Sequence, residues 1–226
     1  MKLYIFSGAT PERHYKDIYE KSFKLWKKEW EKTYSHDFKE KKIFFADEFT
    51  RQNFWIVLCI DSEPVGMVSI RQISFQNPII QHDSWFRFFP KSDLSTFIEK
   101  QSPNCLISSN FVVKEEFRKS NSKHKISECI AQLNSLFALE LGFNIHFGCS
   151  NNSRSVDKIV AATGARILSK AIPYKNGVEL NSFYWTEEDM RKTVPNYPIT
   201  SMRIFKEKID FTLLTKDQNE YTKKAG

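Results

Sequence analysis

The chain has 226 residues, of which 41% are hydrophobic and 27% charged, a composition typical of one globular domain with a proper core. Its net charge of +7 favours an acidic partner: nucleic acid, anionic lipid, coenzyme A or an acidic carrier protein. No apolar run approaches the ~18 residues that span a membrane, and no signal peptide opens the sequence, so we expect a cytoplasmic protein without an integral membrane segment.

Four cysteines lie in stretches that have the pattern of apolar strands or helices, and their spacing does not match a metal site. We therefore expect buried free thiols, as in a reducing compartment. These residues are Cys59, Cys105, Cys129 and Cys149.

The N-terminal region predicts a strand and then a long helix. Lys2–Phe6 alternates as a strand does, and Thr10-Pro11-Glu12 is a helix start in which a capping hydroxyl precedes proline. An aromatic stripe at helical spacing then predicts core packing, and an outer row of lysines either docks an acidic partner or is simply solvated. The stripe is Tyr15, Ile18, Tyr19, Ser22, Phe23, Trp26 and Trp30; the lysines are Lys24, Lys27, Lys28 and Lys32.

Residues 43–49 are either a second helix or a loop, and they carry Asp47 and Glu48. Two β-rich runs follow, residues 55–60 and 65–73. Because residues 61–64 read Asp-Ser-Glu-Pro, a turn composition, the two runs predict a hairpin.

Residues 74–104 form an apolar but unpatterned insertion, in which 92–100 fit a short helix. This segment either walls a pocket for a long acyl chain or a bulky acceptor, or packs as a flap over the sheet, or makes a dimer contact.

A strand–helix–strand unit occupies residues 106–150, with a helix whose apolar residues recur at i, i+3 and i+4. Residues 106–113 and 144–150 are the strands, and Gly142 stands where a C-terminal glycine ends the helix. A shorter helix is expected at about 153–163. The apolar face of the long helix is Ile126, Cys129, Ile130, Leu133, Leu136, Phe137 and Leu141.

The turn before the long helix is strongly basic, with Arg118, Lys119, Lys123, His124 and Lys125. A helix N-terminus already carries about half a positive charge, so each added cation costs ~0.3–1 kcal/mol unless something compensates. Either an anion such as phosphate binds the N–H groups of the first turn, or the turn is a solvated basic loop.

Two further strands, 166–172 and 178–185, are joined by a loop that contains Asn176-Gly177, the strongest short hairpin signal. Residues 186–226 are polar, with one basic-apolar segment at 202–214 and a lysine-rich tail. We expect a main domain over residues 1–190 and a C-terminal extension over 191–226.

The stretch Val113-Lys114-Glu115-Glu116-Phe117-Arg118-Lys119-Ser120-Asn121-Ser122-Lys123 resembles the cofactor-binding motif of the Gcn5-related N-acetyltransferase (GNAT) superfamily, whose backbone amides hold the pyrophosphate of acyl-coenzyme A. Asn151-Asn152, the helix ending in Thr163-Gly164-Ala165, and Glu63-Pro64-Val65-Gly66 are similar to other GNAT motifs. The resemblance covers residues 55–186. It implies an α/β (α+β) fold with a mixed, mostly antiparallel central sheet flanked by helices. The cofactor-binding residues that it implies are Phe111, Val112, Val113, Arg118, Lys119, Ser120, Asn121, Ser122, Lys123 and Asn152.

The sequence departs from the motif at three positions. Asn121 and Lys123 replace two small residues, and Val160 stands where the family often has a tyrosine. With the basic surface and the apolar insertion, these departures favour longer acyl groups, donated by acyl-CoA or acyl carrier protein. In this the chain resembles the autoinducer synthases and the long-chain N-acyl amino acid synthases.

The sequence shows no Ser/His/Asp set, metal cluster or phosphate loop, but acyl transfer from an activated thioester needs mainly orientation and an oxyanion donor. The resemblance places that donor at residues 110–113. Glu48, Asp47, Ser108 and Asn110 could take the proton of the amine or relay it through water, although a carboxylate in such a place is more often a surface acid.

We therefore expect an N-acyltransferase acting on a small-molecule amine, with no permanently bound cofactor, with acyl-CoA or acyl carrier protein as co-substrate, and with the oligomeric state left open. The alternative is a catalytically inactive GNAT-like binding or regulatory protein. Nucleic-acid binding is not expected, since only the net charge favours it.

Overall fold

The computed structural model describes residues 1–9, 15–89, 104–118 and 125–212, and its centre is an eight-stranded mixed sheet. The strand order is β6-β7-β5-β4-β3-β2-β1-β8; the β4–β5 and β1–β8 pairs are parallel and the others antiparallel. The prediction of a mixed, mostly antiparallel sheet is therefore confirmed. The strands are β1 (Lys2–Phe6), β2 (Phe54–Ile60), β3 (Glu63–Ser74), β4 (Asn104–Val113), β5 (Ile145–Asn151), β6 (Arg166–Pro173), β7 (Glu179–Thr186) and β8 (Ile209–Asp210).

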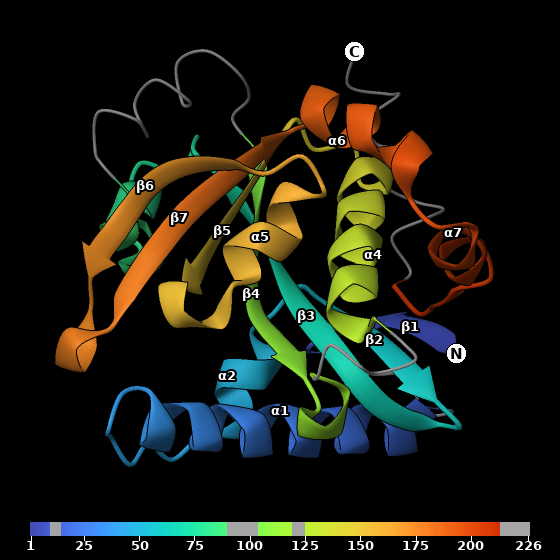
Figure 1. Cartoon of the computed structure of the whole chain (residues 1–226), viewed down its shortest axis with the longest axis horizontal. Coiled ribbons are helices and arrows are strands. Elements are labelled where there is room, and N and C mark those ends of the chain that lie inside the picture. Colours follow the sequence, from blue (N-terminus) through green and yellow to red (C-terminus); the bar gives the residue numbers. More distant parts are fainter. Residues whose placement is uncertain (10–14, 90–103, 119–124, 213–226) are drawn as a thin grey trace.

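Helices cover both faces of the sheet (Figure 1). We call the face under α4 and α5 the front face and the opposite one, which carries α1 and α2, the back face. The α-helices are α1 (Lys16–His36), α2 (Ala46–Thr50), α4 (Ile126–Glu140), α5 (Val156–Ala161), α6 (Glu187–Thr193) and α7 (Ile199–Lys206). Short 3₁₀ turns are η2 (Ile80–His82), η3 (Ser84–Phe88), η4 (Glu115–Phe117), η5 (Asn152–Arg154), η6 (Lys175–Gly177) and η7 (Val194–Asn196).

The front core forms because α4 presents its predicted apolar face to the sheet. Ile130, Leu133 and Phe137 are almost completely buried against β2, β3 and β4. Gly142 adopts a φ of +72° directly after the helix, a left-handed conformation that glycine reaches without strain. The long helix and its end were thus correctly predicted.

The back core contains the aromatic stripe of α1. Trp26 is 1% exposed, and Phe49 of α2 stacks on Trp55 with ring centroids 4.3 Å apart. The sequence left residues 43–49 open between helix and loop, and the structure has the five-residue helix α2 there. The predicted helix start at Thr10-Pro11 lies outside the described residues.

The described part of the insertion packs as a flap on the back face, beside β5. Phe86 and Phe89 contact Phe147 with centroid distances of 6.5 and 5.4 Å, and the three rings form one buried cluster with Ile107 of β4. The short helix expected at residues 92–100 lies outside the described residues.

The polar segment after residue 186 is more structured than its composition suggests. Thr186 caps α6 by accepting from the Asp189 amide at 3.1 Å, Ile204 of α7 is buried in the front core, and β8 pairs in parallel with β1. The capping hydroxyl three residues before an acid, followed by basic residues, was a usable helix signal that the sequence reading missed.

None of the helices in the part of the chain that the structure describes is long and apolar enough to cross a membrane.

Candidate active site

The sheet opens between its two central parallel strands. β4 and β5 pair only at Leu106↔His146, Ile107↔Phe147 and Ser108↔Gly148. Beyond Ser108, β4 runs on to Val113 and β5 to Asn151 as separate edges of a gap. Backbone groups on the facing sides of the two strands are therefore available to a ligand that lies between them.

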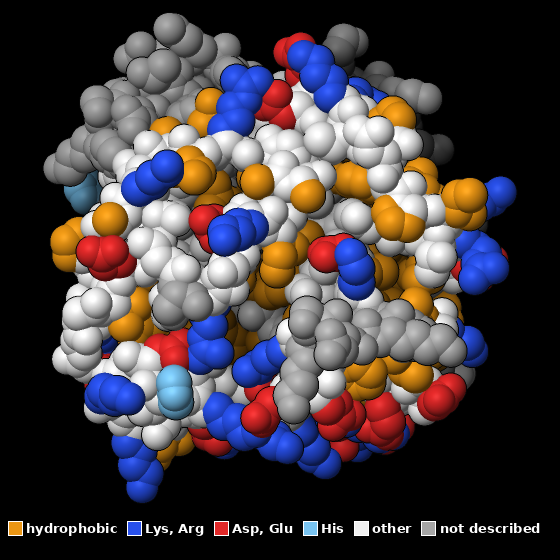
Figure 2. All heavy atoms as spheres, viewed as in Figure 1, with side chains coloured by type: hydrophobic (Ala, Val, Ile, Leu, Met, Phe, Trp, Pro, Cys, Tyr) orange, Lys and Arg blue, Asp and Glu red, His pale blue; other side chains and the backbone are white. Residues whose placement is uncertain are grey.

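The gap holds a cavity of about 550 Å³, a volume in the usual range for small-molecule sites. Figure 2 shows apolar side chains between α5 and α4 on this side of the molecule, above a band of charged side chains of both signs along α1. The lining residues are Glu29, Trp30, Thr33, Tyr34, Asp37, Phe38, Val68, Trp85, Ser108 to Val113 of β4, Arg118, Ser127, Ala131, Asn134, Cys149 to Asn151 of β5, Arg154, Val156, Ile159, Val160, Tyr174, Leu180, Phe183 and Trp185.

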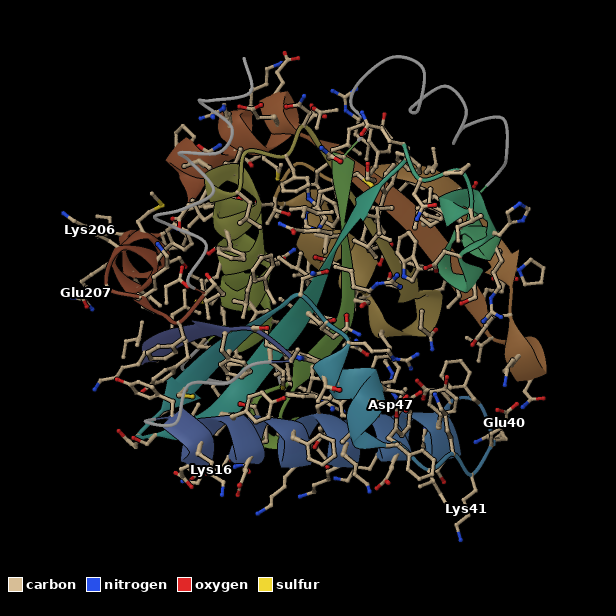
Figure 3. The ribbon with its side chains drawn as sticks, turned by 180° about the vertical axis from the view of Figure 1, so that it is seen from behind. Lys16, Glu40, Lys41, Asp47, Lys206 and Glu207 are labelled. Carbon is tan, nitrogen blue, oxygen red and sulfur yellow. The ribbon has the colours of Figure 1, made fainter. Side chains whose placement is uncertain are left out.

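Six of the predicted site residues line this cavity: Ser108, Asn110, Phe111, Val112, Val113 and Arg118. Lys119, Ser120, Asn121, Ser122 and Lys123 lie outside the described residues. The remaining two, Glu48 and Asn152, are not among the lining residues. Glu48 lies on α2 and accepts a bond from Lys42 at 2.6 Å, and Asn152 donates to Glu179 at 3.4 Å. Asp47, also on α2, is 64% exposed and pairs with Arg51 (Figure 3).

Ser108 lies at the closed end of the gap in a buried polar cluster. Its Oγ is 2.9 Å from Asn134 Oδ1 and 2.6 Å from His146 Nε2. Burial lowers the pKa of His146 to about 3, so this imidazole is too weak a base to activate the hydroxyl. The fold thus brings a serine and a histidine into hydrogen-bond contact although 38 residues separate them in the sequence. The two do not form a catalytic pair, because the histidine is too weak a base.

Cys149 is the cysteine that borders the cavity, and burial raises the pKa of its thiol to about 12. A thiol that stays protonated at neutral pH is a poor nucleophile. Cys59, Cys105 and Cys129 are buried, as expected, and Cys149 is half-buried. The described residues contain no group of histidine, cysteine and acidic side chains that could hold a metal ion.

Asn110 occupies a kink in β4, with a φ of +53°. Its side chain accepts from Trp26 Nε1 at 3.2 Å and donates to Ser69 Oγ at 2.9 Å, so it is turned toward α1 and β3. Asparagine is, after glycine, among the residues that most readily adopt this conformation.

Two ion pairs connect α1 to the two arms of the gap. Arg118, just after β4, donates to Glu29, which is 3% exposed, and to the Val113 carbonyl at 2.7 Å. Arg154, just after β5, holds Asp37 through bonds of 2.8 and 2.6 Å. Burial raises the pKa of Asp37, but hydrogen bonds from Arg154 and His36 outweigh it and keep the pKa below its usual value. The C-terminal half of α1 therefore spans the open end of the gap.

Aromatic rings line the cavity beside this end of α1. Tyr34 and Phe38 have centroids 4.7 Å apart, and Phe38 contacts Tyr174 of the β6–β7 hairpin at 5.4 Å. Trp30 and Trp85 also line the cavity. Burial, with a contribution from Tyr174, raises the pKa of Tyr34 well above its usual value, so this phenol stays protonated and cannot act as a base.

The sequence reading missed the residues that α1 contributes. Glu29 falls on the aromatic stripe, three residues after Trp26, and an acid on an otherwise apolar helix face was a usable signal. Asp37, Arg154 and Tyr174 had no comparable signal because the tertiary fold alone brings them together.

No protein-family model matches the sequence, and no curated protein matches it. Solved structures do match its fold. A CoA-dependent acyl-homoserine lactone synthase, BjaI, solved with SAM and isopentyl-CoA, aligns with a TM-score of 0.58 and 10% identity, covering 90% of this chain and 98% of the other. FeeM, an N-acyl amino acid synthase from uncultured soil microbes, aligns with a TM-score of 0.53 and 11% identity, covering 89% of this chain and 98% of the other. A provisionally assigned phosphinothricin N-acetyltransferase aligns with a TM-score of 0.52 and 10% identity, covering 82% of this chain and 99% of the other.

At these identities the likeness establishes the fold. The chain has the GNAT fold, in the form shared with acyl-homoserine lactone synthases and an N-acyl amino acid synthase, and the resemblance read from the sequence is confirmed at this level.

Proposed function

We propose that the protein is an N-acyltransferase that moves an acyl group from a phosphopantetheine thioester to the amine of a small molecule. The observation that carries this proposal is the cavity at the point where β4 leaves β5 within a GNAT fold. A cleft between strands that part inside a sheet provides both backbone hydrogen-bonding groups and apolar walls for an extended donor.

The donor would lie along the free side of β4, with its phosphates at the start of α4. α4 begins at Ile126, no side chain of the described residues caps it, and Ser127 of its first turn lines the cavity. The N–H groups of a first helical turn attract anions. Arg118 already pairs with Glu29, so it would reach a phosphate only by sharing that ion pair.

In the proposed reaction the amine nitrogen attacks the thioester carbonyl carbon, the C–N bond forms, the C–S bond breaks, and the thiolate leaves with the electron pair. The amine loses a proton and the thiolate gains one. Backbone amides of residues 110–113 would stabilise the oxygen as charge develops on it, and orientation in the cleft contributes on the order of several kcal/mol. Since His146 and Tyr34 are unsuited as bases, the carboxylates that line the cavity, Glu29 and Asp37, are the candidates that accept the proton, directly or through a water relay.

The acceptor would enter beside the aromatic rings of α1 and the β6–β7 hairpin, which line the same cavity as Ser127 of α4. Acyl-CoA and acyl carrier protein are both candidate donors, and BjaI, the matched structure with isopentyl-CoA, is a CoA-dependent enzyme. A long acyl chain is supported by the apolar residues Phe111, Val160 and Phe183 in the wall.

Native mass spectrometry with acetyl-, octanoyl- and dodecanoyl-CoA, and with the same groups on acyl carrier protein, tests the donor. Product detection with a panel of amines then tests transfer. We expect binding of at least one acyl thioester and formation of an N-acyl product. If neither donor class binds, the enzyme proposal is wrong.

Ser127→Glu tests phosphate binding at α4 in a variant that should fold as the wild type does. A carboxylate in the first turn of α4 favours the helix dipole, so the fold is not weakened. The same charge repels phosphate, and we expect about tenfold weaker donor binding, the equivalent of ~1.4 kcal/mol. Ser127→Ala is the control and should bind as the wild type does. Equal binding by both variants would place the phosphates elsewhere.

A catalytically inactive binding protein of the same fold is the second candidate. The ion pairs that occupy Arg118 and Arg154 favour it, because they reduce the charge available for a phosphate. Donor binding without product in the presence of the amine panel would support this candidate.

A further inference from the structure

The kink in β4 is a β-bulge at the place where the cavity opens. β3 and β4 are in register at Met67↔Val112 and again at Ser69↔Ser109, so Val68 alone faces two residues, Asn110 and Phe111. A bulge bends its strand and increases the local twist. The last β4–β5 pair is at Ser108, two residues before Asn110, and the two strands part where the bulge begins.

The side chain of Asn110 fastens this bulge to two buried groups. Its Oδ1 accepts from Trp26 Nε1 at 3.2 Å, and its Nδ2 donates to Ser69 Oγ at 2.9 Å. Ser69 in turn donates to the Ser109 carbonyl at 3.1 Å. Trp26 is 1% exposed and Ser69 fully buried, so both anchors belong to the rigid back core.

The same bonds occupy the polar atoms of the Asn110 side chain. Its carbonyl oxygen is used by the indole and its amide nitrogen by the serine hydroxyl, and breaking either contact would leave a buried polar group unsatisfied. Asn110, expected from the sequence as a candidate proton acceptor, is therefore better placed to hold its own backbone than to move a proton.

We propose that Asn110 and Trp26 are positioning residues: they hold the β4 bulge so that the backbone from Phe111 to Val113 faces the cavity and β4 stays apart from β5. The proposal rests on the proposed acyl transfer for its kinetic consequence. Trp26 is not among the residues that line the cavity, and the polar atoms of the Asn110 side chain are already bonded to Trp26 and Ser69. The two residues determine the position of the backbone amides that face the reacting carbonyl.

Asn110→Gly tests the contribution of the side-chain hydrogen bonds while leaving the backbone free to keep its conformation. Glycine adopts a positive φ without strain, so the bulge can still form, but its anchors are lost. Displacing a reacting group by ~1 Å can cost up to ~100-fold in rate. We expect kcat to fall about tenfold or more, with the KM for the acyl donor changed less than kcat. Asn110→Ala, which also opposes the positive φ, should lose more.

Trp26→Phe and Trp55→Phe form a matched pair. Both remove a buried indole N–H bond in the same core, but Trp55 donates to the Phe49 carbonyl at 3.0 Å and not to Asn110. The rings of Trp26 and Trp55 have centroids 6.3 Å apart, and phenylalanine keeps an aromatic ring at either position. We expect Trp26→Phe to reproduce the loss of kcat and Trp55→Phe to keep the wild-type kcat while losing comparable thermal stability. Equal kcat in the two variants, or wild-type kcat in Asn110→Gly, would overturn the proposal.

Hydrogen–deuterium exchange of the peptide that contains residues 109–113 provides a readout that does not need activity. We expect faster exchange in Asn110→Gly and Trp26→Phe and unchanged exchange in Trp55→Phe. If the wild type transfers no acyl group, the proposed function is wrong but exchange still tests the positioning role. If the wild type is active and exchange is unchanged in all three variants, the positioning role alone is wrong.

Discussion

His146 shows how a single buried side chain links the closed end of the cavity to protein stability. It is fully buried, stacks on Trp185 with centroids 4.6 Å apart, and contacts Ser108. Among the described residues its Nδ1 has no hydrogen-bond partner. A charged imidazole would lack compensation there, which is why its pKa is as low as about 3.

This environment predicts a loss of stability in mild acid. The unfolded chain takes up a proton on His146 near pH 6.5, whereas the folded chain resists it down to about pH 3. The folded state therefore binds fewer protons in this window, and the free energy of unfolding should fall as the pH drops through it, by ~1–2 kcal/mol between pH 6.5 and 5. Urea denaturation across that range measures the slope.

His146→Gln should flatten that slope, whatever its effect on absolute stability. His82→Gln on η2 is the control, because this side chain is exposed, and should leave the slope unchanged. A slope that persists in His146→Gln would assign the pH dependence to other groups.

Single residues near the site could be predicted only where the surrounding stretch of sequence had a recognisable strand, turn or motif. Residues of the wall from Ser108 to Val113 were expected because the strand and the basic turn after it resemble the GNAT motif, and the structure places these residues on the cavity. The pairing of Glu29 with Arg118, and of Asp37 with Arg154, joins positions 89 and 117 residues apart. Such contacts depend on how α1 crosses the sheet, which local pattern does not encode.

At the scale of elements, α7 illustrates the difference between composition and packing. Residues 199–206 mix apolar, basic and hydroxyl side chains within a mostly polar segment, yet Ile204 is 5% exposed in the front core and Ser201 donates to Gln132 of α4 at 2.7 Å. Ile199, on the same helix, is 87% exposed. The helix is thus held by a narrow apolar contact that a composition-based reading overlooks.

Ile204→Ala should cost ~2–4 kcal/mol of unfolding free energy, because it leaves a cavity in the core. Ile199→Ala should change it by less than ~0.5 kcal/mol. Chemical denaturation of the two variants makes the comparison on one helix with one type of substitution. Equal, small effects would mean that α7 contributes little to the fold.

Other elements were predicted because their signals are local. The hairpins and the long helix followed from turn residues and apolar periodicity, and each lies where the sequence placed it to within a few residues. The bulge in β4 was not predicted, since its only sequence mark is one asparagine inside an apolar run. β8 has two residues, too few for any pattern.

For the whole molecule, the GNAT order of elements was recognisable from the sequence, whereas the width and lining of the gap were not. The gap separates β5, β6 and β7 from the rest of the sheet, and the cavity is lined from both sides. A donor that lies in it contacts both parts at once. Its binding should therefore stabilise the whole fold and not only one edge.

Thermal unfolding with and without acyl-CoA tests this linkage. A ligand at 100 times its Kd adds ~2.7 kcal/mol, which for a chain of this size corresponds to a rise in Tm of about 5–10 °C. Ser127→Glu should show a smaller rise at the same concentration, and Ser127→Ala the full one. A transition that splits in two on adding acyl-CoA would contradict stabilisation of the fold as a unit.

The short β4–β5 join has a consequence for how such a chain evolves. Three residue pairs fasten the strands at one end, while ion pairs and rings from α1 and the β6–β7 hairpin span the other. Exchanging those spanning side chains would change the size of the opening while the three β4–β5 pairs still hold the closed end together. Proteins of this fold can therefore come to accept molecules of different width while the arrangement of their strands and helices stays the same.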